Sequence, residues 1–124
     1  MKTIYLKTTD PLKKSAIEDI CKEQNIGMYM IKGTDINRTI AAVCGVHINK
    51  AGNHRRAPAI YTLPEMVLFF GIDDDSLDSF LDAYNAAGLE KIRRKAVVTP
   101  TNLNWTLYEL AEELEKEIFT KDGR

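Results

Sequence analysis

The sequence predicts an α/β protein, a single domain in which one mixed sheet carries helices packed on it. Three observations predict this class. Segments rich in β-branched and aromatic residues alternate with segments whose apolar residues recur at helical spacing. The order strand, helix, strand, helix occurs twice along the chain. A length of 124 residues suits one domain with its own core.

In the first half, residues 3–7 alternate as a strand does, and Asp10-Pro11 is typical of a helix start. We expect the helix to end at Gly27, followed by a second strand over 28–31. A polar segment then leads to a short helix over 38–44. The apolar residues assigned to the buried stripe of the first helix are Leu12, Ala16, Ile17, Ile20 and Cys21.

In the second half, residues 65–72 are nearly all apolar, which predicts a central strand covered on both faces. Asp73 to Ser76 provide a helix cap, Gly88 ends that helix, and residues 95–99 form the next strand. The two helices of this half are predicted from apolar residues at helical spacing: Leu77, Phe80, Leu81 and Tyr84 in the first, and Leu107, Leu110, Ala111, Leu114 and Ile118 in the last.

The two halves can be aligned with each other. Asp10 matches Asp73 at an offset of 63 residues, and past the second strand the segment 34–40 matches 101–107 at an offset of 67. We therefore expect one domain over residues 1–124, built from half-repeats at about 1–45 and 65–118 in a pseudo-twofold arrangement. A basic linker over 46–63 would join them.

The charge balance and the cysteines exclude several classes of protein. The chain has 17 Lys and Arg and 18 Asp and Glu, so no overall field favours nucleic acid or an anionic membrane as a partner. It has no apolar run of membrane-spanning length and no secretory signal, which predicts a cytoplasmic protein with no membrane partner. Cys21 and Cys44 fall on apolar helical patterns and are expected to be buried free thiols.

One stretch resembles a known family. Residues 95–106 read KAVVTPTNLNWT, after the strand over 66–71 and the helix over 77–81, and a helix with Glu112 and Glu113 follows. Over roughly residues 65–118 this pattern is similar to a family of small bacterial proteins known as domain of unknown function 3783. The resemblance implies no activity and assigns no catalytic residue.

The strand-to-helix loops over 32–38 and 99–106 hold the candidate ligand site. In open α/β sheets, ligands bind beyond the carboxyl ends of strands, where helix N-termini favour anions. If both loops lie at the same end of the sheet, they would face one crevice. An alternative interpretation is that the loop over 99–106 serves only to begin the helix. Thr106 and Glu109 have capping-box spacing, and Trp105 and Leu110 would form the hydrophobic staple. The residues assigned to the crevice are Lys95, Thr99, Thr101, Asn102, Asn104, Lys32, Thr34 and Asn37.

Other candidate sites are interpreted as ordinary structure. The acidic run over 73–78 could hold a cation but also suits a helix N-terminus. Cys44, His47 and His54 fit no common zinc spacing, and the basic run over 54–56 is short. Phosphate-binding and nucleophile-elbow motifs are not found. We therefore assign no metal, no cofactor and no catalytic residue.

Three functions remain open. The preferred hypothesis is a binding or regulatory module for a small anionic ligand. The second is a protein-interaction module or homodimer, in which the acidic last helix meets the basic linker of another copy. The third is an enzyme of unknown reaction, for which the sequence gives the weakest support.

Overall fold

The computed structural model describes residues 2–48 and 52–121, and its elements alternate as predicted. The strands are β1 (Thr3–Lys7), β2 (Gly27–Met30), β3 (Met66–Phe70) and β4 (Lys95–Val97). The helices are α1 (Pro11–Glu23), α2 (Ile40–Cys44), α3 (Asp74–Ala86) and α4 (Leu107–Lys121). Two 3₁₀ turns, η1 (Gly33–Asp35) and η2 (Asn102–Asn104), precede α2 and α4. The predicted α/β class is confirmed.

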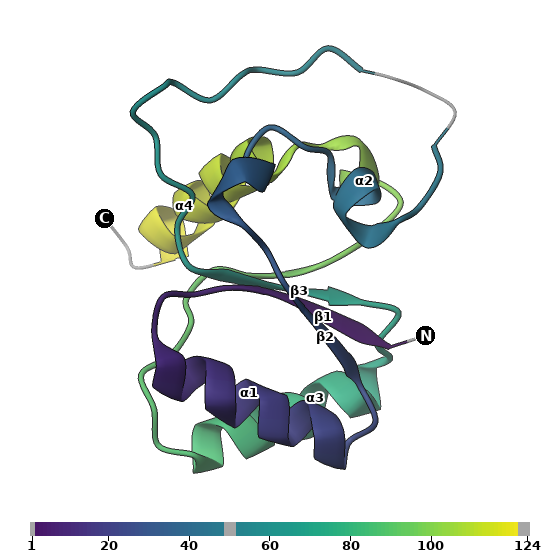
Figure 1. Cartoon of the computed structure of the whole chain (residues 1–124), viewed down its shortest axis with the longest axis vertical. Coiled ribbons are helices and arrows are strands. Elements are labelled where there is room, and N and C mark those ends of the chain that lie inside the picture. Colours follow the sequence, from purple (N-terminus) through teal and green to yellow (C-terminus); the bar gives the residue numbers. More distant parts are fainter. Residues whose placement is uncertain (1, 49–51, 122–124) are drawn as a thin grey trace.

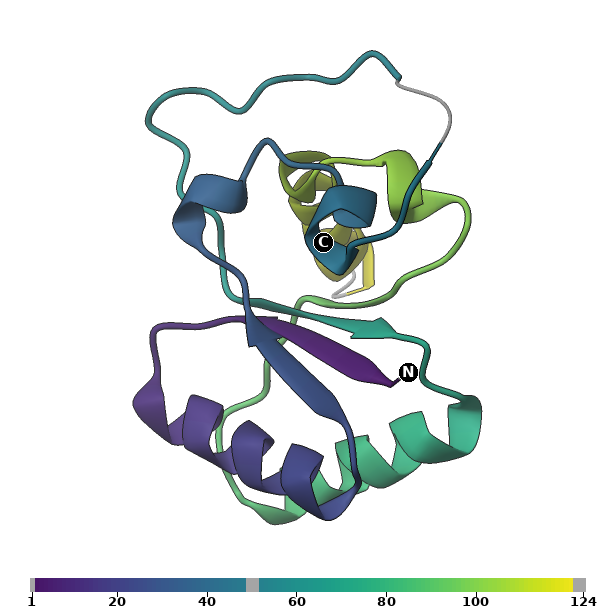
Figure 2. The ribbon, with the colours of Figure 1, turned by 45° about the vertical axis from the view of Figure 1, so that its right-hand side comes forward.

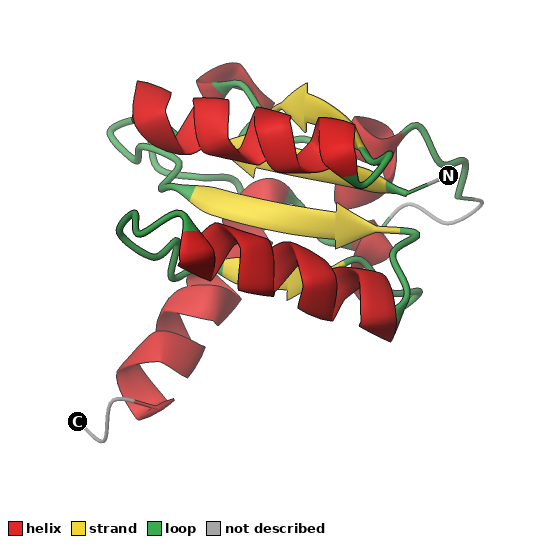
Figure 3. Ribbon diagram, turned by 90° about the horizontal axis from the view of Figure 1, so that it is seen from below, coloured by secondary structure: helices red, strands yellow, loops and turns green. Residues whose placement is uncertain are grey.

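The four strands form one mixed sheet in the order β2-β1-β3-β4. β1 and β2 are parallel, β3 and β4 are parallel, and the central pair β1 and β3 is antiparallel. Helices cover both faces, so the molecule has three layers (Figure 1). α1 and α3 lie side by side across one face (Figure 3), and α2 and α4 lie on the other.

The register at the centre of the sheet follows the sequence repeat. Tyr5 of β1 pairs with Leu68 of β3, which stands 63 positions later and is its equivalent in the repeat. On either side, Ile4 pairs with Phe69 and Leu6 pairs with Val67. Ile4 is equivalent to Val67, and Leu6 is equivalent to Phe69, so the repeat relates these two pairs to each other. The pairing of β1 with β3 thus has the register of a local twofold axis through Tyr5 and Leu68.

Strand alternation divides the core into two layers. Ile4, Leu6, Val67 and Phe69 face α1 and α3 and pack against residues such as Ile17. The residues between them in sequence face α2 and α4, and this second cluster includes Tyr5, Met66, Leu68, Leu107, Leu110, Ala111 and Leu114. Both cysteines are free, as predicted: Cys21 is buried in the first layer, and Cys44, only half-buried, packs against the second.

One residue predicted for the core lies outside it. Leu12 is 66% exposed, and the inward position on α1 belongs to Lys13, which is 4% exposed. The buried stripe therefore runs through Lys13, Ile17, Ile20 and Cys21. A charged residue takes an inward position because its Nζ lies 2.9 Å from Oε1 of Glu65, which also accepts a hydrogen bond from Thr8. Periodicity alone cannot anticipate such a buried ion pair.

The helix ends follow local chemistry. Asp10 and Asp73 are the N-caps of α1 and α3, and their side chains accept from backbone N–H groups of the first turn. α1 ends earlier than predicted, at Glu23. Its left-handed residue is Asn25, with φ 58°, rather than Gly27, which lies in β2. The equivalent of Asn25 after α3 is Gly88, with φ 74°.

The predicted capping box at the start of α4 is present. Thr106 Oγ1 accepts from the N–H of Glu109 at 3.1 Å, and the Glu109 carboxylate accepts from the N–H of Thr106 at 2.9 Å. Trp105, which precedes the cap, is half-buried against the core. Across the described ranges, none of the helices combines the length and apolar character needed to cross a bilayer.

Candidate functional site

The loop after β2 holds three of the predicted ligand residues, and they have different surroundings. Lys32 is exposed and lines a hollow beneath α2. Thr34 is exposed on the 3₁₀ turn. The Oδ1 atom of Asn37 accepts from the N–H of Ala57 at 2.9 Å, so this side chain holds the segment that joins the two halves.

In the loop after β4, Thr99 and Asn102 are occupied in forming the turn. The buried Asn102 accepts from the N–H of Thr99 at 2.9 Å and donates to the carbonyl of Val97 at 3.0 Å. Thr99 Oγ1 in turn accepts from the N–H of Asn102 at 3.2 Å. Thr101 is exposed beside them. These contacts close the loop on itself and give Asn102 a structural role.

Asn104 and Lys95 line other hollows. Asn104 contacts a hollow beside Trp105, and its buried Oδ1 atom has no hydrogen-bond partner among the described residues. The Lys95 ammonium donates to the carbonyl of Ile92 at 3.0 Å and stands at the mouth of a pocket beside α3. It also borders a hollow beside α4, together with Asn102.

The strand directions explain this separation. β1 and β3 run antiparallel and each is parallel to its outer neighbour, so the carboxyl ends of β2 and β4 lie at opposite ends of the sheet. The two loops leave from these opposite ends and meet above the sheet, where Thr39 and Thr106 form an isolated antiparallel bridge. A crevice with both loops at one end of the sheet would need β2 and β4 to point the same way.

A large hollow that includes the predicted residue Lys32 lies between α2 and the strands β1 and β2. Its volume is about 600 Å³. The rings of Tyr5 and Tyr29 stack there with their centroids 5.7 Å apart and their planes 21° apart, and Phe70 and Thr3 border them. Tyr29 is 60% exposed, so its ring faces solvent at the edge of the sheet. We call this space the α2 hollow.

The α2 hollow exists because α2 is short. α4 has 15 residues and covers β3 and β4, whereas α2 has five and stops at Gly45, whose φ of 72° is left-handed. The face of β1 and β2 is therefore left partly uncovered, and Thr3, Tyr5, Tyr29 and Met30 line the hollow there. Gly27, opposite Thr3 in the pairing of β1 with β2, adds no side chain at this edge.

Charged groups stand at the rim of the α2 hollow. The Arg38 guanidinium donates to Asp35 at 3.0 Å and to the carbonyl of Ala42 at 3.1 Å, while 52% of its side chain stays exposed. Asp35 also accepts from the N–H of Lys32 at 2.9 Å. The positive charge of Arg38 offsets the negative charge of Asp35. The Lys32 ammonium therefore gives the rim a net positive charge.

The Tyr5 hydroxyl and the Cys44 thiol, both weak acids, line the α2 hollow in their neutral forms. Burial, followed by the neighbouring Cys44 thiol, raises the pKa of Tyr5 to about 12. Burial also raises the pKa of Cys44, against the lowering effect of its hydrogen bond with Tyr5. Both groups are uncharged at neutral pH, and they leave the positive charge of the rim unopposed from below.

Sequence reasoning missed the aromatic residues of the α2 hollow. Tyr5 and Tyr29 occupy alternating positions that face the same side of paired strands, and this signal was available. The open face itself depends on how far α2 extends, which the stop at Gly45 determines.

The basic linker and the acidic helix, which we expected could join two copies, contact each other within the chain. His54 Nδ1 lies 3.0 Å from Glu109, and the N–H of Arg55 donates to the same carboxylate at 3.2 Å. The Arg55 guanidinium pairs with Glu112, which also accepts from the hydroxyl of Tyr108. Residues 52–63 thus form a strap that is joined to α4 through His54 and Arg55 and runs along the outside of the helices (Figure 2).

The acidic run after β3 serves the helix that follows it. The Asp73 carboxylate accepts from the N–H of Ser76 at 2.7 Å, and this bond is the main reason that its pKa is lowered. Within residues 2–48 and 52–121, no three His, Cys, Asp or Glu side chains converge as metal ligands do.

Comparison with known proteins identifies a family for the second half. Residues 65–118 match the family described as Domain of unknown function (DUF3783). They run from the residue before β3 into α4, so the C-terminal half carries a DUF3783 domain. Neither a curated protein nor a solved structure matches the chain significantly.

Proposed function

We propose that this protein is a binding module for a small anion with a flat apolar body, and that the α2 hollow is its site. The observation that carries this proposal is the combination of stacked aromatic rings with a cationic rim. The rings of Tyr5, Tyr29 and Phe70 line a space of about 600 Å³, within the ordinary range of ligand sites. The charged groups of Lys32 and Arg38 border it.

Each part of such a ligand has a matching surface. A flat ring would lie against the exposed face of Tyr29, where stacking replaces water on both partners. Its carboxylate or phosphate would reach the Lys32 ammonium and the exposed part of the Arg38 guanidinium. The proposed site thus agrees with the preference for an anion that the sequence predicts. It includes one of the two predicted strand-to-helix loops, the loop over 32–38.

The proposal is tested by thermal unfolding of the full chain with 2-naphthoate, nucleoside monophosphates, inorganic phosphate and 2-naphthol. A ligand that binds the folded state raises the melting temperature in a concentration-dependent way. We expect this rise with at least one aromatic anion and a smaller rise, or none, with phosphate and with the uncharged naphthol. No rise with any aromatic anion at millimolar concentration would refute the proposal.

Two variants assign the site. Tyr29→Ala and Lys32→Gln are each expected to weaken binding about tenfold, because each removes one recognition element, a stacked ring or a charged hydrogen-bond donor. Leu12→Ala is the matched control, since Leu12 is similarly exposed but lies on α1, on the other face of the sheet. Equal affinity in all three variants would exclude the α2 hollow.

A further inference from the structure

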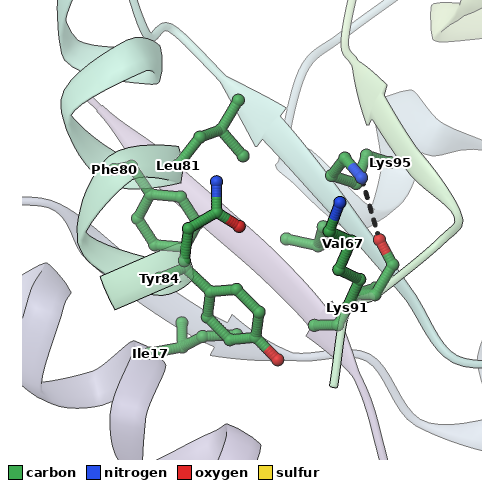
Figure 4. A pocket seen from close by; sticks show the side chains of 9 residues that line it. Ile17, Val67, Phe80, Leu81, Tyr84, Lys91 and Lys95 are labelled. Carbon is green, nitrogen blue, oxygen red and sulfur yellow. Dashed lines mark hydrogen bonds between the residues drawn. The ribbon is translucent and has the colours of Figure 1, made fainter. Parts of the chain in front are cut away.

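A second pocket lies on the opposite face of the sheet, between α3 and β4 (Figure 4). Its volume is about 140 Å³. The inner wall is buried and apolar, with Phe80 and Tyr84 from α3 on one side and Val67 of the central strand beneath. Among residues 2–48 and 52–121, nine line the pocket and none of these is acidic: Ile17, Val67, Phe80, Leu81, Tyr84, Asn85, Lys91, Ile92 and Lys95.

This pocket coincides with the place where the two halves differ in length. Ile4 of β1 pairs with Met28, and its equivalent Val67 of β3 pairs with Lys95. Met28 and Lys95 are therefore equivalent residues of the two halves. Met28 comes three positions after the left-handed residue Asn25, whereas Lys95 comes seven positions after Gly88. Four additional residues therefore separate α3 from β4. The longer connection carries Lys91 and Ile92, which line the pocket, and the first half has no counterpart to it.

Two lysines border the mouth of the pocket. Lys91 and Lys95 are both exposed, and Figure 4 shows their side chains on the same side of the opening, across from Leu81 and Tyr84. The Lys95 ammonium donates to the carbonyl of Ile92 and so stays close to the rim. Tyr84 turns its hydroxyl away, to the carbonyl of Glu90 at 2.7 Å, and leaves its ring to the wall.

We infer that this pocket binds a small monocarboxylate whose apolar body is about the size of a benzene ring. The volume is close to that of an engineered apolar cavity of about 150 Å³ that takes up benzene. The body would contact Phe80 and Leu81, and the carboxylate would lie at the mouth between the two ammonium groups. The buried side chains of Ile17 and Val67 close the far end, so larger ring systems are excluded.

A titration of the ¹⁵N-labelled full chain tests this inference with benzoate, benzyl alcohol and 2-naphthoate. We expect benzoate to shift the amide signals of Leu81, Tyr84 and Ile92, and to bind about tenfold more tightly than benzyl alcohol, which has the same ring without the charge. 2-Naphthoate should leave these signals in place. Equal binding of benzoate and benzyl alcohol, or no shift at these residues, would overturn the inference.

Lysine variants locate the carboxylate. Lys91→Gln and Lys95→Gln should each weaken benzoate binding about tenfold. Lys14→Gln is the control, because Lys14 is also an exposed lysine but lies on α1 and does not line the pocket. Unchanged affinity in both test variants would refute the site. Tyr29→Ala should still bind benzoate as the parent does, and loss of binding in that variant would instead place benzoate in the α2 hollow.

Discussion

Thr39 and Thr106 pair in an antiparallel bridge, and they are equivalent residues of the two halves. The backbone hydrogen bonds beside the bridge are equivalent too: the N–H of Ile40 donates to Trp105 at 2.8 Å, and the N–H of Leu107 donates to Arg38 at 3.0 Å. Each of these residues stands 67 positions from its counterpart.

The same symmetry relates Tyr5 to Leu68 at the centre of the sheet. Two contacts far apart in the sequence thus each pair a residue with its equivalent in the other half. We propose that the two halves, at about 1–45 and 65–118, are copies of one module, with the linker over 46–63 added between them. The equal lengths of α1 and α3, 13 residues each, and their Asp caps support this proposal.

This proposal predicts how the second half behaves alone. Without β1, the strand β3 loses its antiparallel neighbour and exposes an apolar edge. We expect a fragment of residues 65–121 to form a dimer in which β3 pairs with β3 about Leu68, as measured by analytical ultracentrifugation. A fragment that folds as a stable monomer would argue against the proposed duplication.

The cap of α4 is expected to contribute measurably to stability. Thr106→Ala removes the acceptor for the N–H of Glu109 and should lower the free energy of unfolding by about 1–2 kcal/mol in urea denaturation. Thr106→Ser keeps the hydroxyl and should recover most of the loss. Thr101→Ala, at an exposed position, should have almost no effect.

The buried lysine of α1 gives a second stability prediction. Lys13→Met leaves Glu65 without its cation and should lower the free energy of unfolding by about 3 kcal/mol. This cost is near the lower limit for breaking a buried ion pair, because 28% of the Glu65 side chain is exposed. Replacing both partners, in Lys13→Met with Glu65→Gln, should recover much of this loss. Lys14→Met on the exposed face serves as the control. A double variant less stable than Lys13→Met would contradict this expectation.

Glu109 predicts a pH dependence. Its burial raises the pKa, but hydrogen bonds from the N–H groups of Thr106 and Arg55 and from His54 outweigh burial, and the net pKa is lowered. The folded pKa lies below the unfolded one, so the stabilisation is complete above the unfolded value and is lost as the pH falls through the folded value.

Urea denaturation of the parent chain and of Glu109→Gln at pH 7 and pH 3 tests this dependence. The variant should be less stable at pH 7, and the difference should shrink at pH 3. Glu113→Gln, an exposed neighbour on α4, is the control and should differ little from the parent at either pH. A difference of the same size at both pH values would contradict the assigned hydrogen bonds.

The two thiols should react at different rates. Burial raises the pKa of Cys21 to about 11, and it lies inside the layer of α1 and α3. Cys44 is half-buried and borders the α2 hollow. Alkylation by iodoacetamide at pH 8 should therefore be slow at both, faster at Cys44, and further slowed at Cys44 by an aromatic anion in the hollow. Mass spectrometry after digestion distinguishes the two sites.

The elements of this fold could be predicted because their signals are local. The aspartate caps, the apolar stripe of α4 and the Thr106 capping box each depend on a few neighbouring residues. The burial of Lys13 in the position expected for Leu12 could not be predicted. It depends on Glu65, which is 52 positions away in the sequence.

The candidate site depended even more on distant relationships. The repeat in the sequence predicts two equivalent strand pairs but does not place their loops relative to one another. The antiparallel pairing of β1 with β3 is what sends the two polar loops to opposite ends of the sheet. The α2 hollow arises because α2 is shorter than its equivalent α4. The pocket between α3 and β4 arises because the connection between these elements is longer than its equivalent in the first half.

The antiparallel centre of the sheet also has a kinetic consequence. Each outer strand pairs with a neighbour from its own half across one helix, whereas β1 must find β3 across about half of the chain. Docking of the two halves should therefore limit the folding rate. Closure entropy changes slowly with loop length, so the strap could gain several glycines remote from His54 and Arg55 with little effect on equilibrium stability.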